Sequence, residues 1–296
     1  MSRDIALVLG SGGARGVAHI GVIHELVEQG YQITSVAGSS MGALIGGIYA
    51  SGKLDEYEKW LRTLDKLDVF GLIDFTLSSS GIIKADKVLN EIRKFIPDRN
   101  IEELSIPFTA VATDIRNKKE VCFSTGSLYK AVRASISIPM VITPAVHGDV
   151  LLVDGGVLNP VPVNRVKRHQ GDLLVAVNVN AQIPMPKKKN TENKNGYIGQ
   201  LTNGRFKAFQ EKMSHLFPAH KKDSIGYFEL GTETSSLMLS QISKLNLELN
   251  PPDLLIEISR QAGGTFDFHK ADELIELGRQ EAKKALKTLN QKNRHS

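Results

Sequence analysis

A serine stands between two glycines in Gly38-Ser39-Ser40-Met41-Gly42, after an apolar run at 33–37 and before a helix-like run of small residues at 41–50. A serine framed in this way at a strand-to-helix junction sits on a sharp turn. Its hydroxyl then stands clear of the sheet, beside backbone N–H groups that can bind an oxyanion. Ser40 is therefore a candidate nucleophile, and the later motif Asp154-Gly155-Gly156 offers it a base.

A second glycine-rich segment, Gly10-Ser11-Gly12-Gly13-Ala14-Arg15-Gly16, follows the apolar run at 5–9. Its glycines let backbone N–H groups point into a cavity, and the helix expected after them adds a positive end. The segment can cradle a phosphate, stabilise an oxyanion or form only a tight turn. A Walker loop would need Lys where Val17 stands, and the dinucleotide fingerprint would need glycine in place of Arg15. Both nucleotide hypotheses are therefore weakened.

The composition is that of an ordinary globular protein of one large or two small domains, with 296 residues, 41% of them hydrophobic and 23% charged. The net charge is +5, and much of the excess lies at 187–189, at 221–222 and after Lys283. These lysines lack the interleaved aromatic residues of a nucleic-acid reader, so no nucleic-acid partner is expected. Two alternatives remain for them: a solvated surface that aids solubility, or weak peripheral attraction to an anionic membrane.

The single cysteine, Cys122, excludes an intrachain disulfide, and its place in a predicted strand favours a small buried hydrophobic residue. No apolar run approaches the ~18–20 residues of a transmembrane helix. The first residues do not resemble a signal peptide, so we expect a cytoplasmic protein, with any membrane contact at the inner face. No His, Cys and Asp cluster has metal-ligand spacing, and we expect neither a metal nor a cofactor.

The start of the chain alternates strand, helix, strand and helix at 5–9, 16–30, 33–37 and 41–50, which predicts a parallel sheet with helices on its faces. Further helices are expected at 54–64, 85–95, 128–134, 163–169, 205–216, 228–249 and 271–289. Further strands are expected at 108–114, 120–124, 173–180 and 254–258. A turn at 147–149 joins extended runs at 141–146 and 150–153, and the segment 69–81 is expected to be irregular.

Four stretches together resemble the patatin-like phospholipase family, specifically its bacterial branch related to neuropathy target esterase. They are GSGGARGVAHIGV at 10–22, GSSMG at 38–42, RASISIP at 133–139 and DGGVLNPVP at 154–162. The resemblance covers about residues 5–180 and implies a three-layer αβα fold with a mainly parallel central sheet. We divide the chain into a catalytic core at 1–180, a polar insertion or lid at 181–226 and a C-terminal part at 227–296 that completes the same domain.

The resemblance implies a serine hydrolase with a Ser–Asp dyad, in which Ser40 attacks an acyl carbonyl and Asp154 is the base. Gly12, Gly13 and Met41 would form the oxyanion hole, and Arg15 would either hold the loop or assist the anion. An Asp of ordinary pKa, near ~3.9, is a feeble base toward a hydroxyl. Desolvation raises that pKa, so we expect Asp154 to be buried. The family often has glycine at the position of Ser11.

A Ser–acid–His triad stays open on residue order alone, since His169, His215, His220 and His269 all follow Asp154. None of these histidines stands in a glycine-framed loop. His19, on the helix after the first glycine segment, is expected to be a packed or capping residue.

The leading hypothesis is a lipid acyl hydrolase that cleaves fatty-acyl esters of phospholipids or lysophospholipids. Ile136, Ile138, Met140 and Val141 either line an acyl pocket or belong to the ordinary core, and 182–222 is either a lid or a surface loop. A non-catalytic lipid-binding or regulatory protein on the same fold and an acyltransferase are the alternatives. Head group, acyl length and oligomeric state do not follow from the sequence.

Overall fold

The computed structural model describes residues 3–73, 75–78, 81–185 and 227–292. The chain divides into two compact units, one formed by Met1–Pro184 with Leu239–Ser296 and the other by Met185–Met238. The first unit contains the central sheet and the three motifs at 10–16, 38–42 and 154–156. The predicted helix at 205–216 and most of the predicted lid, 186–222, lie outside the described residues.

The central sheet has eight strands and is mainly parallel, as predicted. Five parallel strands run in the order β10 (Leu254–Ser259), β9 (Leu173–Ala181), β1 (Asp4–Leu9), β2 (Gln32–Ser39) and β5 (Phe108–Asp114). Antiparallel strands extend it, with β6 (Lys119–Phe123) and β8 (Val150–Asp154) on β5, and β7 (Ala145–His147) on β8. Parallel neighbours need crossover connections, and helices supply them.

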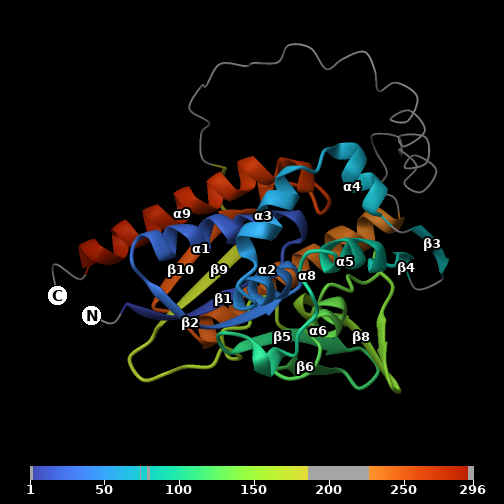
Figure 1. The fold of residues 1–296 in the computed structure, drawn as a ribbon, viewed down its shortest axis with the longest axis horizontal. Coiled ribbons are helices and arrows are strands. Elements are labelled where there is room, and N and C mark those ends of the chain that lie inside the picture. The colour runs from blue at the N-terminus through green and yellow to red at the C-terminus, as the bar shows by residue number, and fades with distance from the viewer. Residues whose placement is uncertain (1–2, 74, 79–80, 186–226, 293–296) are drawn as a thin grey trace, which may run out of the picture. The chain divides into compact units, whose positions relative to one another are not determined.

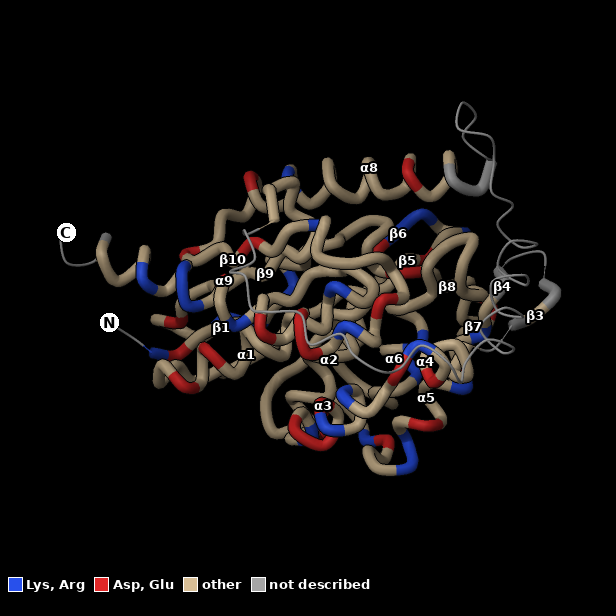
Figure 2. Tube along the Cα trace, turned by 90° about the horizontal axis from the view of Figure 1, so that it is seen from above, with Lys and Arg blue, Asp and Glu red and all other residues tan. Residues whose placement is uncertain are grey.

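Helices cover both faces of the sheet and make a three-layer α/β fold (Figures 1 and 2). The helices α1 (Ala18–Glu28), α2 (Met41–Ala50) and α6 (Leu128–Ser135) lie on one face, and the part of α8 (Tyr227–Leu249) from Leu239 onward lies on the other. Successive side chains of β1 point to opposite faces of the sheet, so this strand packs against the helices on both faces. Ala6 and Val8 belong to the apolar cluster that Leu247 of α8 packs against, whereas Leu9 contacts the α2 side.

The C-terminal helix α9 (Ala271–Lys292) runs beside α1 at a very short backbone separation (Figure 1). A Cβ placed on Gly21 of α1 would stand 1.8 Å from the carbonyl oxygen of Ile275, and one on Gly278 of α9 would stand 2.0 Å from that of Ala18. The two glycines therefore allow the helices to touch. This contact fixes the start of α1, which follows the first glycine-rich segment.

Shorter elements complete the unit. They are α3 (Leu54–Arg62), α4 (Lys66–Leu72), the hairpin of β3 (Phe75–Ser78) and β4 (Gly81–Ile83), α5 (Asp86–Arg93) and the 3-10 turns η1 (Gly13–Val17), η2 (Ile101–Glu103), η3 (Gly155–Val157), η4 (Arg260–Ala262) and η5 (Phe268–Lys270). The prediction of an irregular segment at 69–81 was wrong, because the end of α4 and a strand pair occupy it. None of the helices in the described ranges combines the length and the hydrophobicity needed to cross a bilayer.

Two further predictions from the sequence were wrong. The stretch 163–169 is not a helix but begins with a turn at 163–165 and continues without regular structure. The N–H of Val163 donates to the carbonyl of Val161 and that of Arg165 to the carbonyl of Pro162, so the backbone turns too tightly after Pro162 for the hydrogen bonds of an α-helix. Cys122 is exposed rather than buried. It lies on β6, an edge strand that pairs only with β5 among the described strands, so one side of the residue is left uncovered.

Candidate active site

Ser40 occupies a strained turn between the end of β2 and the start of α2. Its backbone has φ 55° and ψ −123°, a conformation that L-residues rarely adopt. The flanking glycines make the turn possible. A Cβ on Gly38 would stand 2.3 Å from the carbonyl oxygen of Gly42, and one on Gly42 would stand 2.0 Å from that of Leu9.

Ser135, the last residue of α6, holds this turn in place. Its buried hydroxyl accepts a hydrogen bond from the N–H of Ser40 at 2.8 Å and donates one to the carbonyl of Val111 at 2.6 Å. The hydroxyl thus satisfies a buried N–H that has no place in the helix ladder. Ser135 is a positioning residue that sequence reasoning missed, although it lies inside the RASISIP stretch.

Asp154 is the last residue of β8, and its side chain lies close to that of Ser40. Its N–H donates to the carbonyl of Ser137 at 2.9 Å, and its Oδ1 accepts from the N–H of Gly156 at 2.7 Å. The other oxygen, Oδ2, is buried and accepts no well-aligned hydrogen bond from any described residue. The Ser40 hydroxyl is nevertheless close enough to lower the pKa of the carboxyl. The two groups predicted from the sequence are thus brought together.

Burial dominates the acidity of Asp154. The side chain is only 5% exposed, and desolvation raises its pKa to about 6, against the smaller lowering effects of Ser40 and Gly156. Low dielectric disfavours the charged carboxylate and so makes it a stronger base. The expectation of a buried Asp154 is confirmed.

The first glycine-rich segment lies beside Ser40, with free donors. Gly13 and Met41 line the same cavity as Ser40, and Gly12 directly precedes Gly13 without lining it. No described residue accepts a hydrogen bond from the N–H groups of Gly12, Gly13 or Met41. The neighbouring N–H groups, in contrast, are paired: that of Ser11 with the carbonyl of Pro160 at 2.8 Å and that of Ala14 with the carbonyl of Thr265 at 2.9 Å.

Arg15 anchors this segment to β9 and to the loop after η4. It donates to the carbonyl of Val179 at 3.3 Å, to that of Gly263 at 2.8 Å and to Oδ1 of Asn180 at 2.6 Å. Burial, followed by the charge of Arg260, lowers the pKa of Arg15 to about 10. Of the two roles considered for Arg15, these contacts correspond to holding the loop.

His19 contacts the start of the first glycine-rich segment. It is fully buried, and its Nε2 lies 2.8 Å from the carbonyl oxygen of Gly10. Burial lowers the pKa of His19 to about 4, so the ring is neutral at physiological pH. Of the described histidines after Asp154, His169 is exposed and neither it nor His269 lines the cavity at Ser40. His215 and His220 lie outside the described residues.

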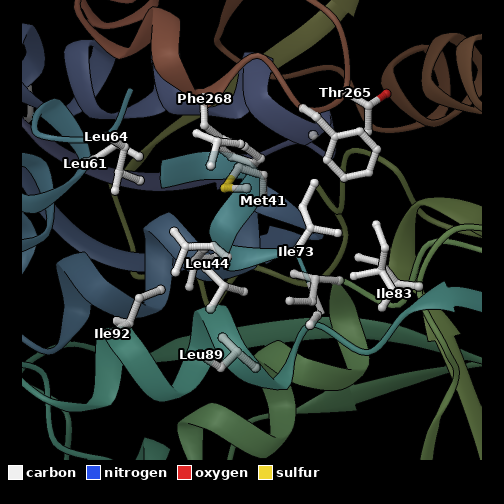
Figure 3. A pocket seen from close by; sticks show the side chains of 18 of the residues that line it. Met41, Leu44, Leu61, Leu64, Ile73, Ile83, Leu89, Ile92, Thr265 and Phe268 are labelled. Carbon is white, nitrogen blue, oxygen red and sulfur yellow. The ribbon is translucent and has the colours of Figure 1, made fainter. Parts of the chain in front are cut away.

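Ser40 lines an apolar cavity. Figure 3 shows many of the other side chains around it. Side chains from several elements line it, among them Met41 and Leu44 of α2, Leu61 of α3, Ile73 after α4, Ile83 of β4, Leu89 and Ile92 of α5, and Phe268 of η5. A cavity of this kind accepts a hydrocarbon chain rather than a charged group.

The four residues proposed for substrate binding divide into two pairs. Ile136 and Ile138 line the apolar cavity. Met140 is 37% exposed with a φ of 68°, and Val141 is buried, but neither lines the cavity. The cavity instead draws Thr265, Phe266 and Phe268 from the C-terminal part, which sequence reasoning left without a role. The pair Gly263-Gly264 was the available signal for a loop there.

The fold and this site define an α/β protein with a strained serine turn, a buried carboxyl group and unpaired N–H donors around an apolar cavity. The family model for patatin-like phospholipase matches residues 7–166. The chain belongs to the patatin-like phospholipase family.

Relatives agree with this assignment. An uncharacterized NTE family protein of Mycobacterium tuberculosis is 34% identical, over 96% of this chain and 92% of its own length. Patatin-like phospholipase domain-containing protein 6 of Mus musculus is 31% identical, over 61% of this chain and 14% of its own length. Among solved structures, VipD from Legionella pneumophila matches with a TM-score of 0.48 at 13% identity, over 96% of this chain and 66% of that one. Family membership supports a lipid hydrolase activity in general.

Proposed function

We propose that the protein is a carboxylic ester hydrolase with a Ser–Asp dyad, acting on the fatty-acyl esters of phospholipids or lysophospholipids. The observation that carries the proposal is that Ser40, on its strained turn, lies close to the buried carboxyl of Asp154 and also lines an apolar cavity.

The reaction proceeds through an acyl-enzyme. As the oxygen of Ser40 attacks the acyl carbonyl, Oδ2 of Asp154 takes the hydroxyl proton. The N–H groups of Gly12, Gly13 and Met41 receive the negative charge that develops on the carbonyl oxygen, and a single donor of this type contributes ~10²–10³ in rate. The tetrahedral intermediate then collapses, and the departing alcohol takes the proton from Asp154.

Deacylation repeats the steps with water in place of the serine hydroxyl. Water attacks the ester carbonyl of the acyl-enzyme as Asp154 takes a proton from it. The acyl–Ser40 bond then breaks, and the oxygen of Ser40 takes from Asp154 the proton that came from water. A pKa near 6 suits both directions of transfer, because the carboxyl is ionised at neutral pH and still retains basicity.

Substrate preference follows from the lining of the cavity. Aliphatic and aromatic side chains surround Ser40 and leave no ionised group in the described lining, so the acyl chain is the part of the substrate that enters. We place the acyl chain against Leu44, Ile136 and Ile138. Contact with an anionic membrane stays a prediction, because the lysines at 187–189 and 221–222 lie outside the described residues.

A hydrolysis screen tests the proposal. Wild type, Ser40→Ala and Asp154→Asn are assayed on p-nitrophenyl esters of increasing chain length and on phospholipids and lysophospholipids. Ser243→Ala is the matched control, since Ser243 is also buried and, among the described residues, its hydroxyl donates to the carbonyl of Leu239 in its own helix.

We expect at least ~10³-fold loss of hydrolysis in Ser40→Ala and Asp154→Asn and none in Ser243→Ala. Full activity in Ser40→Ala would contradict the proposal. Binding of lipid without hydrolysis by wild type would instead identify a non-catalytic lipid-binding protein. Faster product formation with an added alcohol, with the acyl group recovered on that alcohol, would identify an acyltransferase.

A further inference from the structure

A second pocket, called the polar pocket below, lies between α5, α6 and the turn that joins β7 to β8. Its polar lining comes from Asp86, Asn90, Arg93, Lys130, Arg133 and His147. Leu89 lines both this pocket and the apolar cavity, so the two share a wall along α5. The polar pocket is thus adjacent to the apolar cavity but, unlike it, has charged side chains in its lining.

One of its cations is already neutralised. The guanidinium of Arg133 pairs with Oδ1 of Asp86 at 3.1 Å and donates to the hydroxyl of Ser137 at 2.7 Å and to that of Thr143 at 3.0 Å. Asp86 is the single carboxylate in the described lining of the polar pocket, and Arg133 is its ion-pair partner. These contacts also hold Arg133 rigidly as a wall of the pocket.

Of the other two cations, Arg93 has only a long ion pair and Lys130 has none with any described residue. Arg93 stacks over the ring of Tyr129, at 4.6 Å from the ring centroid, and its nearest carboxylate, Asp98, is 3.9 Å away. That carboxylate is itself occupied by the hydroxyl of Ser127 at 2.6 Å. Lys130 forms no ion pair with any described residue.

We propose that the polar pocket binds a phosphate monoester group through Arg93 and Lys130. Lys130, which has no ion-pair partner among the described residues, and Arg93, whose ion pair with Asp98 is long at 3.9 Å, supply positive charge for its two negative charges. The planar guanidinium of Arg93 presents paired donors to phosphate oxygens. The amide of Asn90 adds a further donor. Ring stacking on Tyr129 holds the guanidinium in place, so less side-chain entropy is lost when the anion binds. A soluble phosphate ester and the head group of a phosphatidate offer the same chemistry.

The test uses full-length protein carrying Ser40→Ala, so that its outcome does not depend on hydrolysis. Binding of glycerol 3-phosphate is measured by calorimetry at near-physiological salt. Binding to phosphatidylcholine vesicles with and without phosphatidic acid is measured by co-sedimentation. Each is repeated with Arg93→Gln/Lys130→Gln and with Lys94→Gln/Arg99→Gln, which removes the same charge from exposed residues of the same region outside the pocket lining.

We expect saturable binding of at least one probe, weakened about tenfold or more by Arg93→Gln/Lys130→Gln and less than about twofold by the control pair. Binding of glycerol 3-phosphate would identify a soluble ester as sufficient, whereas binding only to phosphatidic acid vesicles would identify the lipid head group. Equal weakening by both variant pairs, or no saturable binding of either probe, would overturn the proposal. The single variant Lys130→Glu gives the same comparison if the loss of ring stacking unfolds the double variant.

Discussion

Ser39 is the last residue of β2 and Asp154 is the last residue of β8, and both strands lie along the same edge of β5. Ser39 pairs with Val111 and Asp154 pairs with the next residue, Ala112. The strand β6 pairs with Val111 and Ala112 as well, so it must occupy the opposite edge. Because β2 is parallel to β5 and β8 is antiparallel, their carboxyl ends face each other. This arrangement delivers Ser40 and Asp154 to one point from distant parts of the chain.

Gly155 is the residue that lets the two strand ends touch. A Cβ there would stand 2.2 Å from the carbonyl oxygen of Val111 and 2.6 Å from the hydroxyl oxygen of Ser39. The glycine after the acidic residue is therefore required by packing, independently of any turn it forms.

Asp154→Asn is expected to raise stability while removing activity. In the folded protein the carboxyl has a pKa of about 6, above the ordinary 3.8, so the unfolded chain loses this proton more readily. Stability therefore falls as pH rises from about 4 to about 6 and stays lowered above that range. Urea unfolding at pH 7.5 should show Asp154→Asn to be more stable than wild type by about 1–3 kcal/mol, with no difference below about pH 4.

Asp114→Asn provides the contrast for this measurement. Hydrogen bonds from Asn117 hold the pKa of Asp114 below its ordinary value, so ionised Asp114 stabilises the fold. The substitution should lower stability at pH 7.5, and the difference should shrink as pH falls through that pKa. If both substitutions stabilised the protein, the assignment of a raised pKa to Asp154 and a lowered pKa to Asp114 would be refuted.

Ser135→Ala is expected to impair catalysis through the turn alone. The substitution leaves the buried N–H of Ser40 without an acceptor and the carbonyl of Val111 without a donor, which costs about 1–3 kcal/mol. We expect kcat to fall by roughly 10- to 100-fold with little change in KM, because cavity contacts are retained. Restoration of kcat by Ser135→Thr would support the role of the hydroxyl, whereas a wild-type kcat in Ser135→Ala would rule it out.

The sequence predicted which polar residues and glycines come together at the site better than it predicted the residues that line the cavity. Ser40, Asp154 and the glycine segment stand at strand ends, and their residue types are restricted by close backbone contacts, such as that of Gly42 with Leu9. The cavity is different, because aliphatic residues such as Leu61 and Leu89 satisfy the same pattern in any core. Which of them surround a cavity depends on packing between α3, α5 and η5, elements far apart in the sequence.

Errors along the chain have a similar origin. The pattern of apolar and charged residues at 163–169 fits a helix locally, but Val163 and Val166 pack in an apolar cluster of the core from a segment that turns directly after Pro162. Burial of Cys122 depended on whether its strand is central or at an edge, which residue type does not reveal.

Filling the apolar cavity should shorten the acyl chains that the enzyme accepts. Ile73 lines the cavity and is partly exposed, so Ile73→Trp adds bulk at its wall without overpacking the core. Hydrolysis of a p-nitrophenyl palmitate should fall about tenfold or more, while hydrolysis of the butyrate ester should change less than about threefold. The control is Leu67→Trp, on the short helix α4 that ends directly before Ile73 but outside the cavity lining. Equal effects of the two variants on the palmitate would argue against this path for the chain.

Gly21→Ala tests the contact that holds α1 against α9. The new methyl group would meet the carbonyl of Ile275, and the helices would have to separate. We expect a loss of about 1–3 kcal/mol in the free energy of unfolding, measured in urea. Gly71→Ala is the control, since a Cβ on this glycine of α4 meets nothing within 4 Å, and it should be neutral or stabilising by up to about 1 kcal/mol.

The dyad itself is tested most directly by the rate at which a fluorophosphonate modifies the protein as a function of pH, with the modified residue identified by mass spectrometry. The account predicts a single adduct on Ser40. Its rate of formation should rise about tenfold per pH unit below about pH 6 and level off above, as Asp154 ionises. In Asp154→Asn the rate should be lower by ~10²–10⁴ and should lack this pH step. An adduct on another residue, or modification of Asp154→Asn at the wild-type rate, would contradict the account.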